Sequence, residues 1–275
     1  MNKEKRRKNI KKLGYILILV LIYLFFSKND NITDIFEQSD SPKIEDQTNE
    51  KGSSNKTIQT NDSDLVVSVP NFTYTDIPKY NGEPFVVINN NKPLFTEKEI
   101  AYAKSKAYEY YGDLDHLGRA IYGQASIDET IRPKKGEKRE RISNVRPTGF
   151  KSIKYDFIDN GGWLYNRSHL LGYQLTGENA NPKNLITGTR EFNAGSMLPF
   201  ENLVADYLKE NKNRKALYRV TAIYKDDDLV ARGVLMEALS LNDDDYDDLE
   251  YCVFIYNVQQ GIEINYKNGD NRQIK

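Results

Sequence analysis

The pattern of apolar and polar positions divides the 275-residue chain into three parts. An unbroken apolar run, Leu13–Phe26, follows a strongly basic head. Residues 29–67 then carry too few apolar positions to bury a core, which is typical of a disordered polar tether. From residue 68 to the end, apolar positions recur at helical and strand spacing. We therefore expect an anchor at 1–28, a tether at 29–67 and one folded domain at 68–275.

The first 28 residues have the features of an uncleaved signal anchor. The apolar run would be about 21 Å long as a helix, which is short for a bilayer span and typical of a signal-peptide core. Residues 23–28 lack the small-residue pattern that a cleaved signal needs. This favours an anchor over a cleaved peptide, with flanking lysines that lengthen the effective span. The basic head should stay in the cytoplasm, which places residues 68–275 outside the cell.

Periodicity within residues 68–275 predicts a mixed fold. Apolar spacing over 96–111 predicts a helix, with Thr96 as its N-cap and Glu99 completing a capping box. Asn89–Asn91 is typical of a turn, and residues 117–126 of a turn or short helix. Strands are expected at 65–70, 85–90, 218–225, 231–241 and 251–258. Strands on both sides of a helical middle indicate an α+β domain with an antiparallel sheet.

Charge and composition limit the kinds of ligand. The net charge is −1, but residues 1–30 hold eight Lys or Arg against two acidic residues, so the remainder carries −7. Nucleic acid would need a local basic face on that remainder. Residues 132–147 are one candidate, with seven basic residues that include Lys134, Lys135 and Arg139. The stretch is equally consistent with a solvated loop and with a phosphate-binding surface. The single Cys252 rules out an internal disulfide and a cysteine-based metal site.

The stretch 161–210 carries the candidate chemistry. One of only two histidines, His169, sits in NRSHLLGYQL between a polar and an apolar run. The pattern predicts a strand through His169, a polar loop over 176–184, and a helix from about Arg190 that Thr187 or Thr189 can cap. Pro199 would start a second helix or break the first. Asn193 and Glu201 lie on this helical part.

These residue types suit metal-assisted phosphodiester hydrolysis. An imidazole with a pKa near 6.5 can deprotonate water at neutral pH. Mg²⁺ keeps several waters and accepts few protein oxygens, so the side-chain oxygen of Asn193 can suffice. Arg167 or Arg190 can help to hold the phosphate.

The stretch resembles the DNA/RNA non-specific endonucleases of the ββα-metal type, and most closely the membrane-anchored bacterial nucleases of DNA uptake. The family signature is Asp-Arg-Gly-His, then an Asn-Pro-x-Asn loop, then a helical Asn. The equivalents here are Asn166-Arg167-Ser168-His169, Asn181-Pro182-Lys183-Asn184 and Asn193. The resemblance covers about residues 145–265 and implies a ββα-metal core, with a central antiparallel sheet flanked by helices.

The resemblance also implies roles for these residues. His169 would be the general base, and Asn193 the direct ligand of Mg²⁺, for which Mn²⁺ can substitute. Asn184 would orient the histidine or the substrate, and Glu201 would fix metal-bound water. Arg167 would contact phosphate or support the structure. Arg190, Lys134, Lys135 and Arg139 are the expected substrate-binding residues.

Two departures from the signature and several simpler roles stand beside this interpretation. Asn166 replaces the family Asp, and Ser168 replaces Gly. If the Asp supplies negative charge near the metal, Asn166 would weaken metal binding; if it accepts a hydrogen bond, Asn166 can substitute. Glu201 alone would be a solvated helix charge, Arg190 alone a surface ion-pair residue, and His116 is expected to be structural.

The resemblance thus implies a membrane-anchored, extracellular, Mg²⁺-dependent endonuclease. It would cleave DNA without sequence specificity, with RNA left open as a second substrate, in DNA uptake or degradation. The family implies products with 5′ phosphates. The alternative is a surface nucleic-acid-binding protein with impaired catalysis, which Asn166 alone favours.

Overall fold

The structure is a computed structural model that describes residues 67–134, 136–137, 139–242 and 249–274. The predicted anchor, nearly all of the predicted tether, Lys135 and most of the acidic loop 243–250 lie outside the described residues. Within those ranges, no helix is both long enough and apolar enough to cross a membrane. The N-terminal anchor therefore stays a prediction.

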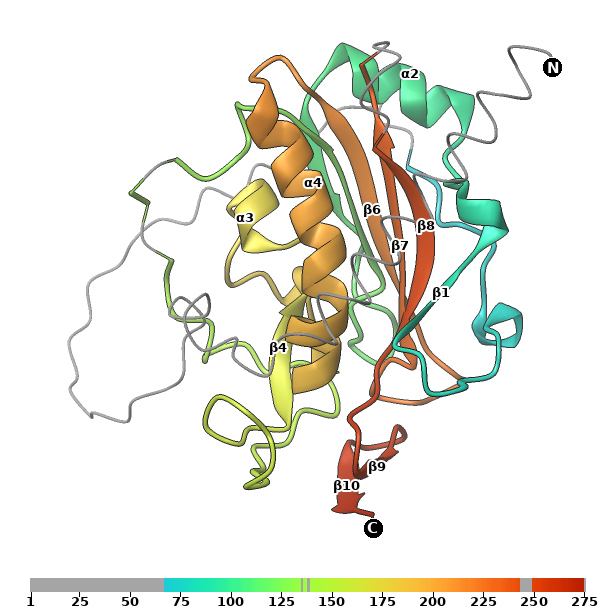
Figure 1. Cartoon of the computed structure of the whole chain (residues 1–275), viewed down its shortest axis with the longest axis vertical. Coiled ribbons are helices and arrows are strands. Elements are labelled where there is room, and N and C mark those ends of the chain that lie inside the picture. The colour runs from blue at the N-terminus through green and yellow to red at the C-terminus, as the bar shows by residue number, and fades with distance from the viewer. Residues whose placement is uncertain (1–66, 135, 138, 243–248, 275) are drawn as a thin grey trace, which may run out of the picture. The chain divides into compact units, whose positions relative to one another are not determined.

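The centre of the fold is a six-stranded antiparallel sheet in the order β1-β8-β7-β6-β3-β2 (Figure 1). Its strands are β1 Phe85–Val87, β2 Tyr108–Tyr111, β3 Tyr122–Ile127, β6 Ala216–Ile223, β7 Gly233–Ser240 and β8 Glu250–Tyr256. The central strands β6 and β7 pair over eight residues, from Ala216–Ser240 to Ile223–Gly233. Every residue of β6 is buried, because other elements cover both faces of the sheet.

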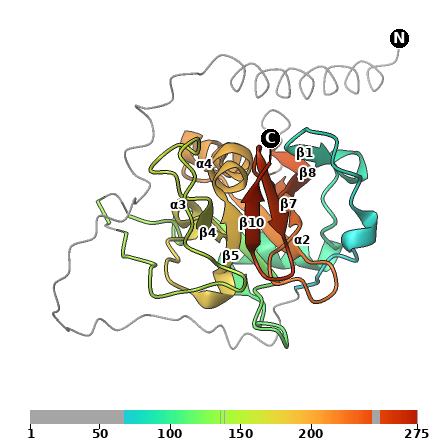
Figure 2. The ribbon, with the colours of Figure 1, turned by 90° about the horizontal axis from the view of Figure 1, so that it is seen from below.

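The remaining elements form a layer on one face of the sheet and smaller units around it. The hairpin β4–β5 lies on the same side of the sheet as α3 and α4, while α2 packs on the other face (Figure 2). These elements are β4 Tyr165–His169, β5 Leu185–Thr189, α2 Glu97–Ser105, α3 Tyr173–Thr176 and α4 Leu198–Glu210. The others are η1 Tyr74–Asp76, η2 Asn89–Asn91, η3 Pro182–Asn184, η4 Glu191–Met197, β9 Ile262–Asn265 and β10 Asp270–Gln273.

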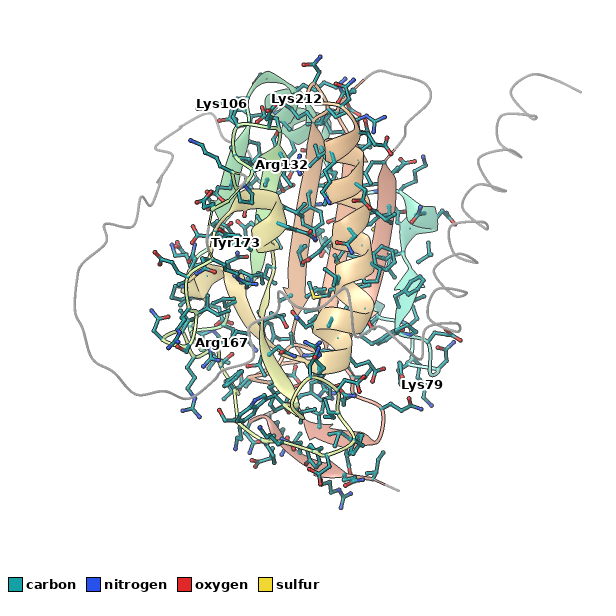
Figure 3. The ribbon with its side chains drawn as sticks, turned by 60° about the vertical axis from the view of Figure 1, so that its left-hand side comes forward. Lys79, Lys106, Arg132, Arg167, Tyr173 and Lys212 are labelled. Atoms are coloured by element: carbon teal, nitrogen blue, oxygen red, sulfur yellow. The ribbon has the colours of Figure 1, made fainter. Side chains whose placement is uncertain are left out.

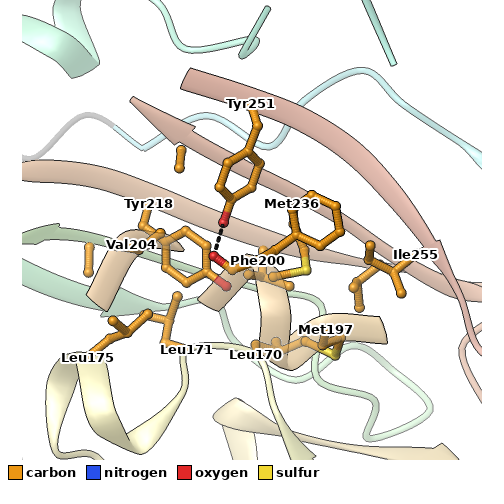
Figure 4. Close-up of a cluster of buried hydrophobic side chains, with 14 of the residues drawn as sticks. Leu170, Leu171, Leu175, Met197, Phe200, Val204, Tyr218, Met236, Tyr251 and Ile255 are labelled. Carbon is orange, nitrogen blue, oxygen red and sulfur yellow. Dashed lines mark hydrogen bonds between the residues drawn. The ribbon is translucent and has the colours of Figure 1, made fainter. Parts of the chain in front are cut away.

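A buried apolar cluster joins the segment after His169 to the sheet (Figure 4). Leu170 and Leu171 are fully buried and pack with Val204 of α4 and Met236 of β7. Each buried leucine contributes about 2 kcal/mol by removing its side chain from water. The backbone that follows His169 is therefore held firmly against the core.

Several predicted elements are confirmed. Thr96 caps α2, its side chain accepts from the Glu99 amide at 3.3 Å, and Glu99 completes the capping box. The Asn89–Asn91 turn is present, with all three residues at positive φ. The three C-terminal strands are β6, β7 and β8, and 85–90 contains β1. The α+β class with a central antiparallel sheet is correct.

Other predicted elements are wrong. The helix ends at Ser105, and residues 108–111 form β2 instead. Residues 117–126 contain most of β3, which pairs with β2 and β6. Tyrosines in β2 have helix-compatible spacing, but pairing with β3 buries Tyr108 and partly buries Tyr110 and Tyr111 on a pleated surface. This tertiary contact outweighs the local pattern. Residues 67–70 form no strand.

Candidate active site

The β4–β5 hairpin places His169 at the end of a strand. Antiparallel pairing runs from Tyr165–Thr189 to His169–Leu185, so the histidine is the last residue of β4. Asn184 fixes the chain beyond it, because its side chain accepts from the Leu171 amide at 2.8 Å and donates to the Leu171 carbonyl at 3.0 Å. Asn184 is fully buried, and these two bonds hold the segment that follows the histidine.

Both ring nitrogens of His169 are engaged. Nε2 lies 2.8 Å from the Asn179 carbonyl oxygen, which can only accept, so Nε2 carries the proton. Nδ1 lies 3.2 Å from Arg139 Nη2, a group that can only donate. Burial and, to a smaller extent, the Arg139 charge lower the pKa of the imidazole, the hydrogen bond to Asn179 opposes them, and the resulting pKa is about 4. His169 is therefore neutral at physiological pH, with Nδ1 as its basic nitrogen.

Arg139 comes from the exposed basic loop and reaches the histidine from outside the hairpin. Its Nε donates to Asn179 Oδ1 at 3.2 Å, and its guanidinium lies 5.4 Å from the centroid of the Tyr173 ring. Asn179 in turn donates to the Glu140 carbonyl, which ties the basic loop to the loop beside His169. Of the predicted substrate-binding residues that the structure describes, Arg139 is the one that hydrogen-bonds to the histidine.

Glu201 lies on the first turn of α4 beside the segment that follows His169. A Cβ added to Gly172 would lie 2.7 Å from Glu201 Oε2, which shows how closely the carboxylate approaches this backbone. Burial raises the pKa of the Glu201 carboxyl to about 7, against the favourable charge of Arg139. His169, Arg139 and Glu201 thus form one electrostatically coupled group, and Glu201 is not an ordinary solvated helix charge.

Asn193 lies on η4, a seven-residue π-helix that continues into α4 at Leu198. Such π-helical turns are rare and are frequently found at functional sites. Thr189 caps this helix, since its hydroxyl accepts from the Phe192 amide at 3.0 Å. Pro199 sits in the first turn of α4, as predicted for the start of a second helix. The half-buried Asn193 side chain makes no hydrogen bond to any described residue.

The available donors fit a hard divalent cation. Asn193 offers an unpaired carboxamide oxygen, and Glu201 offers a carboxylate without a hydrogen bond or ion pair to the described residues. Among these residues, no cluster of three or more His, Cys, Asp or Glu side chains could hold a metal. An oxygen set this small matches Mg²⁺, which keeps most of its water ligands. Asn193 and Glu201, which are eight positions apart on η4 and α4, are the residues that would hold such an ion.

Arg167 supports the structure. It donates to the carbonyl oxygens of Val145 at 2.5 Å and Ser143 at 3.1 Å, and it lies 4.4 Å from the Phe150 ring centroid. Burial lowers the pKa of its guanidinium, and Arg146 lowers it further. Arg167 therefore fixes the loop 143–150 against β4, and a phosphate contact of Arg167 stays a prediction.

Neither Arg190 nor Lys134 makes a hydrogen bond to the His169 ring, whose partners are Arg139 and Asn179. Arg190 follows Thr189, which pairs with Tyr165 four residues before His169, so about 13 Å of strand separates their backbones. Its electrostatic neighbour is Asp159. Lys134 is exposed on the basic loop.

The two departures from the family signature leave polar groups without partners. The Asn166 side-chain nitrogen and the Ser168 hydroxyl are buried and make no hydrogen bond to the described residues. Ser168 points at Gly188 of β5, where an added Cβ would lie 2.2 Å from its oxygen. A buried hydroxyl without a partner costs about 1–3 kcal/mol.

Sequence reasoning missed Asn179, Gly172 and the π-helical turn. Asn179 is the organising residue, because it fixes the tautomer of His169 and holds Arg139. Its only signal in the sequence is its place in a polar loop, which does not distinguish it from neighbouring asparagines. Figure 3 shows Arg132, Tyr173 and Arg167 along one side of the molecule, which is the side of this site.

Residues 99–242 match the DNA/RNA non-specific endonuclease family, and the chain belongs to that family. A curated relative is the deoxyribonuclease of Streptococcus dysgalactiae subsp. equisimilis, 28% identical over 159 residues. That match covers 54% of this chain and 46% of the relative, so the chain spans about half of the relative's length.

Solved structures share the fold. NucA from Streptococcus agalactiae with no metal bound has a TM-score of 0.60 and 25% identity, covering 74% of this chain and 92% of that chain. NucA with a magnesium ion bound has a TM-score of 0.58 and 26% identity, covering 68% and 86%. Sda1 nuclease with a bound zinc ion has a TM-score of 0.58 and 27% identity, covering 70% and 97%. The hairpin β4–β5 with η4–α4 is the ββα unit of this fold.

Proposed function

We propose that this protein is a metal-dependent endonuclease that hydrolyses phosphodiester bonds of DNA without sequence specificity, with RNA as a second candidate substrate. The observation that carries the proposal is the state of His169. Its Nε2–H is fixed on Asn179, its Nδ1 is basic, and a guanidinium stands beside that nitrogen. A neutral imidazole in this setting is a general base beside a phosphate-binding cation.

The chain's own groups have distinct tasks in this reaction. Arg139 Nη2 leaves His169 Nδ1 and binds a non-bridging oxygen of the scissile phosphate, which frees the Nδ1 lone pair and brings the phosphorus close to His169. Nδ1 takes a proton from the attacking water, whose oxygen bonds to phosphorus as the bond to the 3′ oxygen breaks. The departing 3′ oxygen takes a proton from a solvent water, His169 releases its proton to solvent, and the other product keeps a 5′ phosphate. Asn179 keeps the ring in the required tautomer throughout.

The divalent ion is proposed to be Mg²⁺, held by Asn193 with Glu201 nearby. When bound, it supplies positive charge that stabilises the phosphoryl and leaving oxygens. Magnesium in one NucA structure and zinc in Sda1 support a divalent cation at this site. The all-oxygen donors here favour Mg²⁺, with Mn²⁺ as a substitute.

The location and biological role are proposals from the N-terminal sequence. An apolar run behind a basic head supports a single-pass anchor, with the nuclease domain outside the cell. DNA uptake and degradation of external DNA both fit such a location. Recovery of the full-length chain in the medium, instead of in the membrane fraction, would contradict the anchor.

Plasmid nicking by the full-length protein tests the function. We expect cleavage with Mg²⁺, loss of cleavage with EDTA, and a much higher Mg²⁺ requirement in Asn193→Ala. Cleavage that persists with EDTA would contradict the metal requirement. DNA binding in a mobility-shift assay without cleavage in Mg²⁺ or Mn²⁺ would instead favour the impaired nucleic-acid-binding protein.

A further inference from the structure

A pocket of about 300 Å³ lies where the start of η4 meets the turn into the β9–β10 hairpin. Its lining residues are Phe157, Glu191, Gln259, Gln260, Gly261 and Gln273. None of them has a role in the site around His169. The pocket combines an aromatic ring, three carboxamides and one carboxylate, and it has no cationic side chain.

One side of the pocket is rigid. The Glu191 carboxylate accepts from the Gln260 amide at 2.6 Å and from Gln259 Nε2 at 3.3 Å, and the Glu191 amide donates to Gln259 Oε1 at 3.1 Å. These bonds occupy both ends of the Gln259 carboxamide. Glu191 and Gln259 therefore form a fixed wall, whose negative charge disfavours phosphate.

The other groups are available to a ligand. The exposed side chains of Gln260 and Gln273 make no hydrogen bond to the described residues. Each carboxamide can both donate and accept, which suits the edge of any nucleobase. Phe157 is 47% exposed, and its ring packs beside Tyr155 at 5.8 Å between centroids. A Cβ on Gly261 would lie 3.4 Å from that ring, so the ring is supported by its neighbours and still presents surface to solvent.

We propose that this pocket binds one unpaired nucleobase of the substrate strand. Phe157 stacks on the base, and the carboxamides of Gln260 and Gln273 bond to its edge. This inference rests on the proposed nuclease function and names the part of the substrate that the pocket takes. Aromatic stacking accepts every base, so the pocket adds affinity without sequence specificity.

The chain connects this pocket to the reaction site. Glu191 in the pocket wall and Asn193 at the proposed metal site are two residues apart on η4. Arg190 precedes Glu191, and its guanidinium interacts with Asp159, two residues from Phe157. Arg190 is thus placed to neutralise a phosphate next to the bound base. The base would belong to a nucleotide within a few positions of the cut.

The test uses the full-length protein and short single-stranded oligonucleotides. Each has one cleavable phosphodiester among phosphorothioates, and one abasic site that is moved along the series. For wild type, we expect an abasic site at one fixed distance from the cut to lower kcat/KM about five- to a hundredfold. The Phe157→Ala variant should cleave the intact oligonucleotide with the kcat/KM that wild type shows on the abasic one. Its kcat/KM should not change when the abasic site is introduced. Phe157→Tyr should behave as wild type.

Controls separate the pocket from the rest of the proposal. Val87→Ala, another exposed apolar residue at 39% exposure, lies outside the pocket and should change nothing. Fluorescence anisotropy with Ca²⁺ in place of Mg²⁺ measures oligonucleotide binding. The abasic site should weaken binding to wild type and leave binding to Phe157→Ala unchanged. The inference is overturned if no abasic position matters in either assay, or if Phe157→Ala keeps the full abasic effect. Absence of cleavage with the binding pattern intact would reject the nuclease function and keep the base pocket.

Discussion

The two faces of the central sheet carry clusters of charge that differ in how fully they are paired. On the α2 side, the Arg219 guanidinium lies 3.0 Å from Glu99 and 2.8 Å from Glu237, and all three side chains are 0% exposed. On the α4 side, Glu201 has no hydrogen bond or ion pair to the described residues, and Arg139 reaches it only through longer-range attraction.

The difference separates structural charges from functional ones. Burial opposes ionisation of Glu99, but hydrogen bonds from Thr96 and Ser68 outweigh it and lower the pKa of the Glu99 carboxyl. Burial at Glu201 has no such compensation, so the pKa of its carboxyl rises to about 7. Proteins satisfy buried polar groups unless a ligand completes them. The incompletely paired cluster is therefore the one to which we assign the chemistry.

The largest expected effect is a loss of nuclease activity when His169, in the incompletely paired cluster, is replaced. His169→Ala should lower the plasmid-nicking rate by about 10²- to 10⁴-fold, because it removes the base that accepts the proton of water. Added imidazole should restore part of the rate. His116→Ala changes the other histidine, which is exposed, and should keep wild-type activity. Full activity in His169→Ala would reject the assigned base.

Substitutions in the buried Arg219 cluster on the α2 side should lower the stability of the fold. Arg219→Met leaves two buried carboxylates without their cation and should lower the free energy of unfolding by about 3–5 kcal/mol. Urea denaturation measures this. Arg272→Met, which removes an exposed ion pair with Glu263, is the matched control and should cost about 1 kcal/mol or less. Equal losses in both variants would contradict a special role for the buried cluster.

Glu201→Gln should change stability in the opposite direction to Glu99→Gln. The pKa of Glu201 is about 7 in the folded protein and 4.5 when unperturbed. Its contribution to stability is therefore present below pH 4.5 and is lost as pH rises through 7. Glutamine does not ionise, so the Glu201→Gln variant keeps this stability as pH rises. Its free energy of unfolding relative to wild type should therefore increase between pH 4.5 and 7, by at most about 3 kcal/mol.

Urea denaturation in EDTA, below pH 4.5 and above pH 7, measures this gain. Glu99→Gln removes a paired carboxylate and should lose stability above pH 4.5. The Glu201→Gln protein should also need more Mg²⁺ for nicking. A Glu201→Gln variant that is less stable than wild type at high pH would show that its carboxylate is structurally paired.

The smallest expected effect concerns the departures from the family signature. Ser168→Ala removes a fully buried hydroxyl without a partner and should raise the free energy of unfolding by about 1 kcal/mol. Thermal denaturation measures the change as a higher Tm. Ser126→Ala is the matched control, since that hydroxyl donates to the Ala103 carbonyl at 2.8 Å, and its loss should destabilise. A lower Tm in Ser168→Ala would mean that its hydroxyl is satisfied.

Local patterns predicted those parts of the fold that local interactions fix. The Thr96–Glu99 capping box and the Asn89–Asn91 turn depend on residues three positions apart or fewer. The long strands β6, β7 and β8 were predicted because their apolar runs are unambiguous. Residues 108–111 and 117–126 were assigned wrongly because their state depends on pairing between β2 and β3, which the local pattern does not show.

The sequence by itself determined the chemical groups of the site and their order, namely a histidine, a helical asparagine and a following glutamate. The tertiary structure alone decided how they work. It brings Arg139 to a histidine 30 residues away, makes Nδ1 the basic nitrogen through the Asn179 carbonyl, and turns Arg167 into a loop support. These outcomes depend on contacts between distant segments and on burial, which sets the pKa values of His169 and Glu201. Residue type and spacing in the sequence reveal neither the contacts between distant segments nor the burial.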